Sequence, residues 1–299
     1  MKYKRSNRRS TGVRIRYKRV RRTVLWLSLL AMVWLMCSAE ALADSLIERQ
    51  QAFPNWQSKP KVENSSGDLA YPTWMAGRWR VTSTLVDMVA PLAPEIVTPG
   101  FEGNRQFLDQ PITAEIRFVP KPVSEGFFAD LLDNDANDEV EIVSDRAFNG
   151  LSLARAYLGE EGVQAVKVDP DNPNRQITFL KGDQQLISTV TGRRVETPNA
   201  GTFATTEVFQ QFFRSTSRPN PFDDSEPMVY LNEVENTTVY RKRSDPNFPI
   251  TGDQITAIYL SPKDPNYFQA KGQPVALYRY QLSFSPIVEA NQSSKQPKQ

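Results

Sequence analysis

The side chains that could perform chemistry in this chain are carboxylates, lysines, tyrosines and hydroxyls, because it contains no histidine and one cysteine, Cys37. Serine or cysteine nucleophiles that depend on a histidine base are therefore excluded. Zinc sites of the usual histidine or cysteine type, and haem or copper held by histidine, are excluded as well. We expect no catalytic residues, no metal and no cofactor; an enzyme would have to rely on Asp, Glu or Tyr.

The most metal-like pattern is the acidic run at 133–139, where acids recur at the spacing of a calcium-binding loop. Such a loop needs a glycine at its sixth position and a bidentate glutamate at its twelfth. Asp138 and Ser144 occupy these two positions here. We therefore interpret the run as a solvated acidic turn.

A loop at 98–105 combines two glycines with an aromatic, an acidic and a basic residue, namely Phe101, Glu102 and Arg105. Loops on a rigid scaffold often carry binding residues, so these three are candidates for the rim of a ligand site. Arg105 could pair with an anionic ligand group or with Glu102 in the same loop. We favour the pairing within the loop.

Aromatic residues near the C-terminal half are further candidates. Tyr259, Tyr278 and Tyr280 could line a pocket with their hydroxyls pointing inward, or they could be ordinary alternating strand residues. Phe209, Phe212 and Phe213 form a second aromatic group, for which core packing is a simpler explanation than a ligand box.

The elements that position these residues are mostly strands. Apolar side chains alternate with polar ones from Arg78 to Met88 and from Ile112 to Val119, which indicates half-buried strands. Further strand candidates follow at residues 139–144, 163–168, 176–180, 185–191, 202–212, 229–241, 254–260 and 275–284. A helix is expected at 147–158, ended by Gly159, and another short one at 124–132. The pattern predicts an all-β fold, a barrel or a sandwich, of eight to ten strands with one or two short helices. Of the two we favour a single antiparallel barrel.

The N-terminus has the three parts of a cleavable export signal. Residues 1–22 hold eleven basic residues and no acid, 23–39 are uncharged and mostly apolar, and Ala41-Leu42-Ala43 offers small residues to a signal peptidase. We predict cleavage after Ala43, so that the signal is only transiently in the membrane. The alternative is an uncleaved anchor, although seventeen uncharged residues are few for a membrane span. Arg21-Arg22 also fits a twin-arginine signal, and the export route stays open.

Removal of residues 1–43 changes the charge of the protein. The remaining chain has 25 basic and 33 acidic residues, a net charge of −8. Nucleic-acid binding requires a basic surface and is not expected. We divide the chain into the signal at 1–43, an extended lead-in at 44–70, a β-barrel domain at 71–285 and a disordered tail at 286–299.

The segment from Tyr71 to Thr82 contains Gly77 and Trp79 and resembles the entry of a lipocalin, or calycin, barrel. The resemblance implies that Trp79 closes one end of the barrel and that an arginine of the last strand, Arg279, packs over its ring; Arg241 is the second choice. The Thr-Asp-Tyr string found in many lipocalins is absent.

Residues 45–56, 74–87 and 90–106 also resemble an uncharacterised protein family of cyanobacteria and chloroplasts. That resemblance implies a periplasmic or thylakoid-lumenal location and brings no activity with it. We expect an exported protein that binds a small apolar or amphipathic ligand such as a pigment, quinone or lipid. The alternative is an accessory or assembly factor that binds a membrane protein complex through its loops and acidic surface.

Overall fold

The computed structural model describes residues 45–122, 140–215 and 230–288. The predicted signal at 1–43, the predicted helix at 124–132 and the acidic run at 133–139 lie outside these residues. Most of the predicted tail at 286–299 also lies outside them. The described residues belong to a single compact unit that begins at Ser45.

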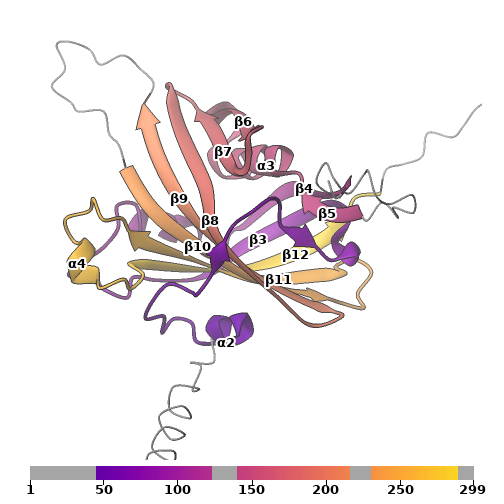
Figure 1. Cartoon of the computed structure of the whole chain (residues 1–299), viewed down its shortest axis with the longest axis horizontal. Helices are drawn as coiled ribbons and strands as arrows, with labels where there is room; N and C mark the ends of the chain where they lie inside the picture. The colour runs from indigo at the N-terminus through magenta and orange to yellow at the C-terminus, as the bar shows by residue number, and fades with distance from the viewer. Residues whose placement is uncertain (1–44, 123–139, 216–229, 289–299) are drawn as a thin grey trace, which may run out of the picture. The chain divides into compact units, whose positions relative to one another are not determined.

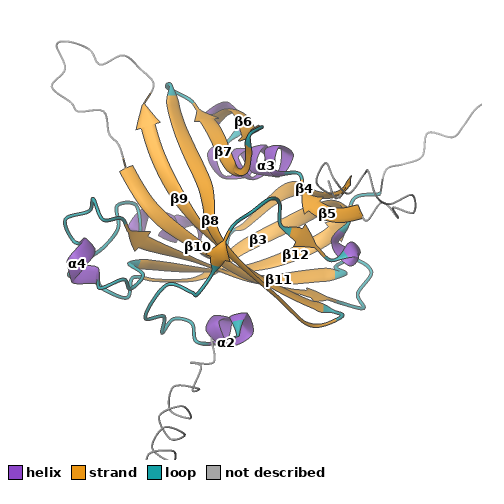
Figure 2. Ribbon diagram, in the orientation of Figure 1, coloured by secondary structure: helices purple, strands orange, loops and turns teal. Residues whose placement is uncertain are grey.

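Twelve antiparallel strands form one sheet (Figure 2). They are β1 (Glu63–Asn64), β2 (Ala70–Tyr71), β3 (Gly77–Val89), β4 (Pro111–Pro122), β5 (Val140–Ser144), β6 (Val163–Asp169), β7 (Asn172–Leu180), β8 (Gln184–Asn199), β9 (Thr202–Ser215), β10 (Tyr230–Lys242), β11 (Ile250–Leu260) and β12 (Ala276–Pro286). Eleven of them follow the order β2-β5-β4-β3-β12-β11-β10-β9-β8-β7-β6, and β1 pairs with β8. The all-β prediction is confirmed: the sheet curls into a half-barrel consistent with a calycin-like fold. The count exceeds eight to ten because the lead-in adds two short strands.

Helix α3 (Arg146–Leu158) lies between the two ends of the curled sheet, next to β4 and β5 on one side and β6 and β7 on the other (Figure 1). Two of its polar side chains bond to the backbone of β4. Asn149 accepts a hydrogen bond from the Arg117 N–H (2.8 Å) and donates to the Arg117 carbonyl (3.0 Å), and Ser152 accepts from the Glu115 N–H (3.0 Å). The helix thus satisfies part of a strand edge that would otherwise present unpaired backbone groups.

The ends of α3 explain why the sequence forms a helix there. The Asp145 side chain accepts a hydrogen bond from the Phe148 N–H, which caps the first turn. The helix stops at Gly159, where φ is +80°, a backbone angle that favours glycine. The predicted helix at 147–158 is therefore confirmed.

Trp79 lies in a cluster of buried side chains at one end of the half-barrel. Its ring is 8% exposed and contacts Phe284, with the centroids 6.3 Å apart, and its Nε1 donates to the Met75 carbonyl (2.8 Å). Gly77 enters β3 with φ +119°, which a side chain would strain. Gly77 therefore starts β3, and Trp79 fills this end of the half-barrel with its ring.

The predicted arginine lid over Trp79 is wrong. In the pairing of β12 with β3, Trp79 is opposite Pro286, whereas Arg279 is opposite Asp87. Seven residues of strand separate the two positions, roughly 23 Å at 3.3 Å per residue. Arg279 instead forms an ion pair with Asp253 (2.6 Å) and lies 5.8 Å from the Phe53 ring.

The opposite end is covered by the loop at 90–110, whose last part is the 3₁₀ helix η2 (Glu102–Phe107). Phe101 is 4% exposed and packs against Tyr278, with the ring centroids 5.8 Å apart. Asn104 Nδ2 donates to the Tyr278 hydroxyl (3.1 Å). This loop closes the end of the half-barrel instead of forming an open rim.

The lead-in is not wholly extended, because it begins with helix α2 (Leu46–Gln51). Ser45 and Glu48 form a capping box at its start. Leu46 is fully buried among side chains of β9 and β10, and Trp56 is 3% exposed against the outer face of the sheet. The prediction failed because the six-residue helix is short and is held by tertiary packing. We call residues 45–62 the N-terminal strap.

Candidate functional site

The main cavity, of about 700 Å³, lies between α3 and the inner face of the sheet. The helix contributes one face, with residues at positions i, i+3, i+4, i+7 and beyond. Opposite stand alternate residues of β7, β8 and β9, as expected for side chains that share one face of a strand. The helix side chains are Arg146, Asn149, Gly150, Leu153, Ala154, Tyr157 and Leu158, and the strand side chains include Gln176, Thr178, Leu180, Leu186, Ser188, Glu207, Phe209, Gln211 and Phe213.

A second chamber of about 350 Å³ adjoins the first on the side of β3, β4, β11 and β12. The two share Tyr71, Ser144, Asn149, Leu153, Tyr157 and Asn236. Asn149, Leu153 and Tyr157 are spaced by four residues, so the inner face of α3 borders both chambers. The helix that closes the half-barrel therefore also forms a wall of its interior.

The main cavity changes in character along α3. At the N-terminal end of the helix, its lining includes Asp68, Tyr71, Arg146 and Glu207. At the C-terminal end it includes Leu158, Leu180, Leu186 and Phe213, beside Tyr157 and Thr178. Leu180 is opposite Val163 in β6, and Phe213 is opposite Leu186. The two ends of α3 are about 18 Å apart at 1.5 Å per residue. This arrangement is amphipathic and suits a ligand with a polar head and an apolar tail.

Most of the charges at the polar end are paired. The Asp68 carboxylate lies 2.5 Å from Lys121 Nζ, and the Glu207 carboxylate 2.7 Å from Arg193 Nη2. Arg146 has neither an ion pair nor a hydrogen bond from its guanidinium to any side chain in the three described ranges.

Two tyrosines border the same end of the interior. Burial raises the pKa of Tyr71 well above its ordinary value, and Tyr240 and Glu207 raise it further, while Arg146 and Arg193 oppose the shift. Burial also raises the pKa of Tyr240 to about 12. Both tyrosines therefore remain neutral at ordinary pH and offer hydroxyls to the interior.

Comparison with known proteins places this architecture in a family. A family model described as a domain of unknown function, DUF6816, matches residues 63–288. The chain belongs to this family. No curated protein and no solved structure matches it. The matched range contains α3 and all twelve strands and therefore the whole cavity, while α2 lies outside it.

Within the DUF6816 range, the structure separates the predicted tyrosines. Tyr280 lines the second chamber. Tyr278 faces the same side of β12 but is covered by the loop with Phe101. Tyr259 points to the opposite face of the sheet, beneath the strap. Of these three, only Tyr280 is among the lining residues of the two chambers.

The loop candidates are also absent from the chamber linings. Phe101 is buried in the end closure, and Glu102 and Arg105 pair with each other at 2.9 and 3.1 Å on the surface. The pairing within the loop that we favoured is confirmed. The aromatic run of β9 contributes more than predicted, since Phe209 and Phe213 line the main cavity as the less favoured ligand-box interpretation requires.

Sequence reasoning missed the inner face of α3 as a site. The signal was present, because Asn149, Leu153 and Tyr157 recur at helical spacing within a predicted helix. Which neighbour that face would meet could not be inferred, since a helix beside a curled sheet can lie inside or outside it.

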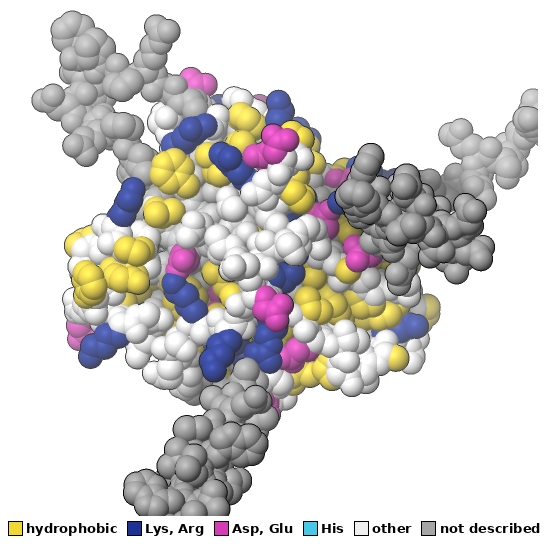
Figure 3. Space-filling view, in the orientation of Figure 1, with side chains coloured by type: hydrophobic (Ala, Val, Ile, Leu, Met, Phe, Trp, Pro, Cys, Tyr) yellow, Lys and Arg dark blue, Asp and Glu magenta, His cyan; other side chains and the backbone are white. Residues whose placement is uncertain are grey.

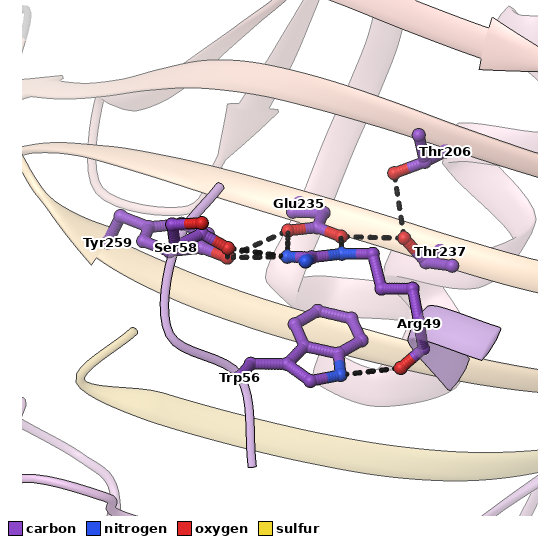
Figure 4. Close-up of polar contacts among 7 residues, drawn as sticks. All are labelled: Arg49, Trp56, Ser58, Thr206, Glu235, Thr237 and Tyr259. Atoms are coloured by element: carbon purple, nitrogen blue, oxygen red, sulfur yellow. Dashed lines mark hydrogen bonds and ion pairs between the residues drawn. The ribbon is translucent and has the colours of Figure 1, made fainter. Parts of the chain in front are cut away.

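A second polar centre lies under the strap on the outer face of the sheet (Figure 4). Glu235 is fully buried, and Arg49 donates to both of its oxygens at 2.7 and 2.8 Å. The Tyr259 and Thr237 hydroxyls donate to the same carboxylate at 2.8 and 2.7 Å. The Arg49 guanidinium also stacks 3.9 Å from the centroid of the Trp56 ring. Each of these polar groups bonds to another group of the same centre. We therefore interpret the centre as a clasp that holds the strap on the sheet.

Two further features bear on chemistry. Over the ranges that the structure describes, no group of three or more Asp, Glu, His or Cys residues could hold a metal ion, and no helix is long and apolar enough to cross a membrane. On the face drawn in Figure 3, basic and acidic side chains are interspersed with hydrophobic ones.

Proposed function

We propose that this DUF6816 protein is an extracytoplasmic binding protein for a small apolar or amphipathic ligand, held between α3 and the inner face of the sheet. The observation that carries the proposal is the cavity of about 700 Å³. Ligand pockets commonly measure roughly 300 to 1,000 Å³, are mainly apolar and contain a few placed polar groups. The extracytoplasmic part rests on the signal-like sequence of residues 1–43.

The cavity lining supports binding better than catalysis. Catalysis needs a nucleophile or a proton-transfer group aimed at a reacting atom. The carboxylates at the cavity, those of Asp68 and Glu207, are each engaged by a cation. The remaining lining offers the Arg146 guanidinium, amides, hydroxyls and hydrocarbon, which recognise and enclose a molecule without reacting with it.

The test uses the protein purified from cells that express the full chain. Native mass spectrometry and solvent extraction should detect a bound apolar molecule. A titration with N-phenyl-1-naphthylamine, a neutral apolar dye, should show saturable fluorescence with one site. If purified protein carries no molecule and does not bind the dye, the proposal is wrong.

A matched pair of variants on α3 locates the binding. Ala154 lines the main cavity, whereas Ala156 lies on the outer face of the same helix, beside β4. Ala154→Phe should fill the cavity and weaken dye binding by about tenfold, corresponding to roughly 1.4 kcal/mol. Ala156→Phe, the same change in the same helix, should leave the affinity within about twofold. Equal effects of the two variants would place the dye elsewhere.

A further inference from the structure

Counted together with their ion-pair partners, the charged side chains that line the main cavity leave one uncompensated positive charge within the described part of the chain. Asp68 is neutralised by Lys121 and Glu207 by Arg193. Arg146 remains, and it is half-buried at the polar end of the lining. A partly desolvated guanidinium favours an anionic partner, because its hydrogen bonds to a charged oxygen are about twice as strong as neutral ones.

The Tyr71 hydroxyl belongs to the same end of the cavity. Tyr71 and Arg146 both line it, and Arg146 acts electrostatically on the Tyr71 hydroxyl. Like Arg146, this hydroxyl has no hydrogen bond to the described residues. A guanidinium and a neutral phenol, both with free donors, together match the oxygens of a carboxylate or phosphate.

The tail of such a ligand would follow a row of apolar side chains, beside the uncharged polar side chains of β7, β8 and β9, which are Gln176, Thr178, Ser188 and Gln211. From the polar end, the lining passes Gly150, which has no side chain, and then Leu153 and Phe209 before it reaches Leu158, Leu180, Leu186 and Phe213. The last four residues carry no charge. A hydrocarbon chain bound along α3 would bury its surface against them, which is favourable by roughly 0.8 kcal/mol for each methylene group.

We propose that the ligand is an amphipathic anion whose carboxylate or phosphate head binds Arg146 and Tyr71 and whose hydrocarbon tail extends along α3 toward Leu158 and Phe213. This inference rests on the proposed function and assigns the ligand class and its orientation. The sequence did not single out either head-group residue, because Arg146 is one arginine among many and Tyr71 precedes the main strand pattern.

The experiment displaces N-phenyl-1-naphthylamine from the full-chain protein with dodecanoate, dodecyl phosphate and dodecanol. These compounds share a tail and differ in the head. The anions should bind about tenfold more tightly than the alcohol, and the better of the two anions identifies the head group. Arg146→Gln should remove this difference, Arg146→Lys should retain part of it, and Tyr71→Phe should reduce it.

Arg155→Gln is the control. Arg155 lies on the outer face of α3, with its Nε 3.2 Å from Glu160, and its loss should leave all three affinities within about twofold. Equal binding of acid, phosphate and alcohol, with no effect of Arg146→Gln, would overturn the head-group assignment and leave the binding function intact. Failure of the dye and of all three compounds to bind would overturn both.

Discussion

Arg49 and Glu235 are 186 positions apart in the sequence and form a two-pronged ion pair in which the carboxylate is completely buried. Arg49 Nε and Nη2 lie 2.7 and 2.8 Å from the two carboxylate oxygens. The pair joins the N-terminal strap to the middle of β10. It makes the strap an integral part of the domain rather than a loose extension.

Loss of one partner of this pair should be costly. Arg49→Met leaves the Glu235 charge buried without its cation and should lower the free energy of unfolding by about 3 to 5 kcal/mol. Urea denaturation monitored by tryptophan fluorescence measures the change. The double variant Arg49→Met/Glu235→Leu should recover much of the loss, because it removes the buried charge as well. A double variant as unstable as the single one would contradict this account.

The contact of α3 with the edge of β4 should depend on Asn149. Asn149→Leu leaves the N–H and carbonyl of Arg117 without their partner and should destabilise the protein by roughly 2 to 4 kcal/mol. Amide hydrogen exchange at Arg117 should accelerate in the same variant. Ser152→Ala removes a single hydrogen bond, to Glu115, and should cost about 1 kcal/mol. If the Arg117 amide exchanged equally slowly in Asn149→Leu and in the unchanged protein, Asn149 would not cap the edge of β4.

Trp79 and Arg279 should differ sharply in their effect on stability. Trp79→Ala empties the end closure and should cost roughly 3 to 5 kcal/mol. Arg279→Gln removes a partly exposed ion pair, with the arginine side chain 37% exposed, and should change stability by no more than about 1 kcal/mol. Thermal denaturation of both variants compares them directly. A large loss in Arg279→Gln would restore the idea that this arginine supports the closure.

Alkaline pH should destabilise the fold through its buried tyrosines. Burial raises the pKa of Tyr240 to about 12, and the pKa values of Tyr71, Tyr259 and Tyr280 are raised as well, chiefly by burial. An unfolded tyrosine ionises near pH 10, so above that pH the unfolded state binds fewer protons than the folded one. The stabilisation from these neutral tyrosines is present below about pH 10 and should be lost progressively as the pH rises above it, for Tyr240 between about pH 10 and 12.

Denaturant unfolding at about pH 8, 10 and 11, below and above the pKa of an unfolded tyrosine, measures this loss of stability. The absorbance of tyrosinate reports the ionisation. Tyr240→Phe should make the decline shallower, because it removes one of the groups that link protons to folding. An unchanged slope in this variant would show that Tyr240 ionises alike in both states.

Much of the local structure follows from the order of residues along the chain. Alternating apolar residues predicted the strands of an antiparallel sheet, and the helix at 147–158 was predicted together with its end at Gly159. The absence of histidine is a property of the chain alone, and the pairing of Glu102 with Arg105 was the favoured of two alternatives that the sequence left open. These features depend on neighbours within a few residues, where sequence patterns report geometry directly.

Tertiary structure decided which side of each element meets which partner. Tyr259 and Tyr280 have similar surroundings in sequence, yet one lies under the strap and the other faces the interior. The alternation of residues in a strand defines its two faces, but it does not show which face points to the interior when both faces are covered. Tyr71 comes close to Arg146 because β2 pairs with β5, the strand that leads into α3. Arg49 meets Glu235 because the strap packs on the outer face of the sheet. Such long-range contacts leave no periodic mark on the chain.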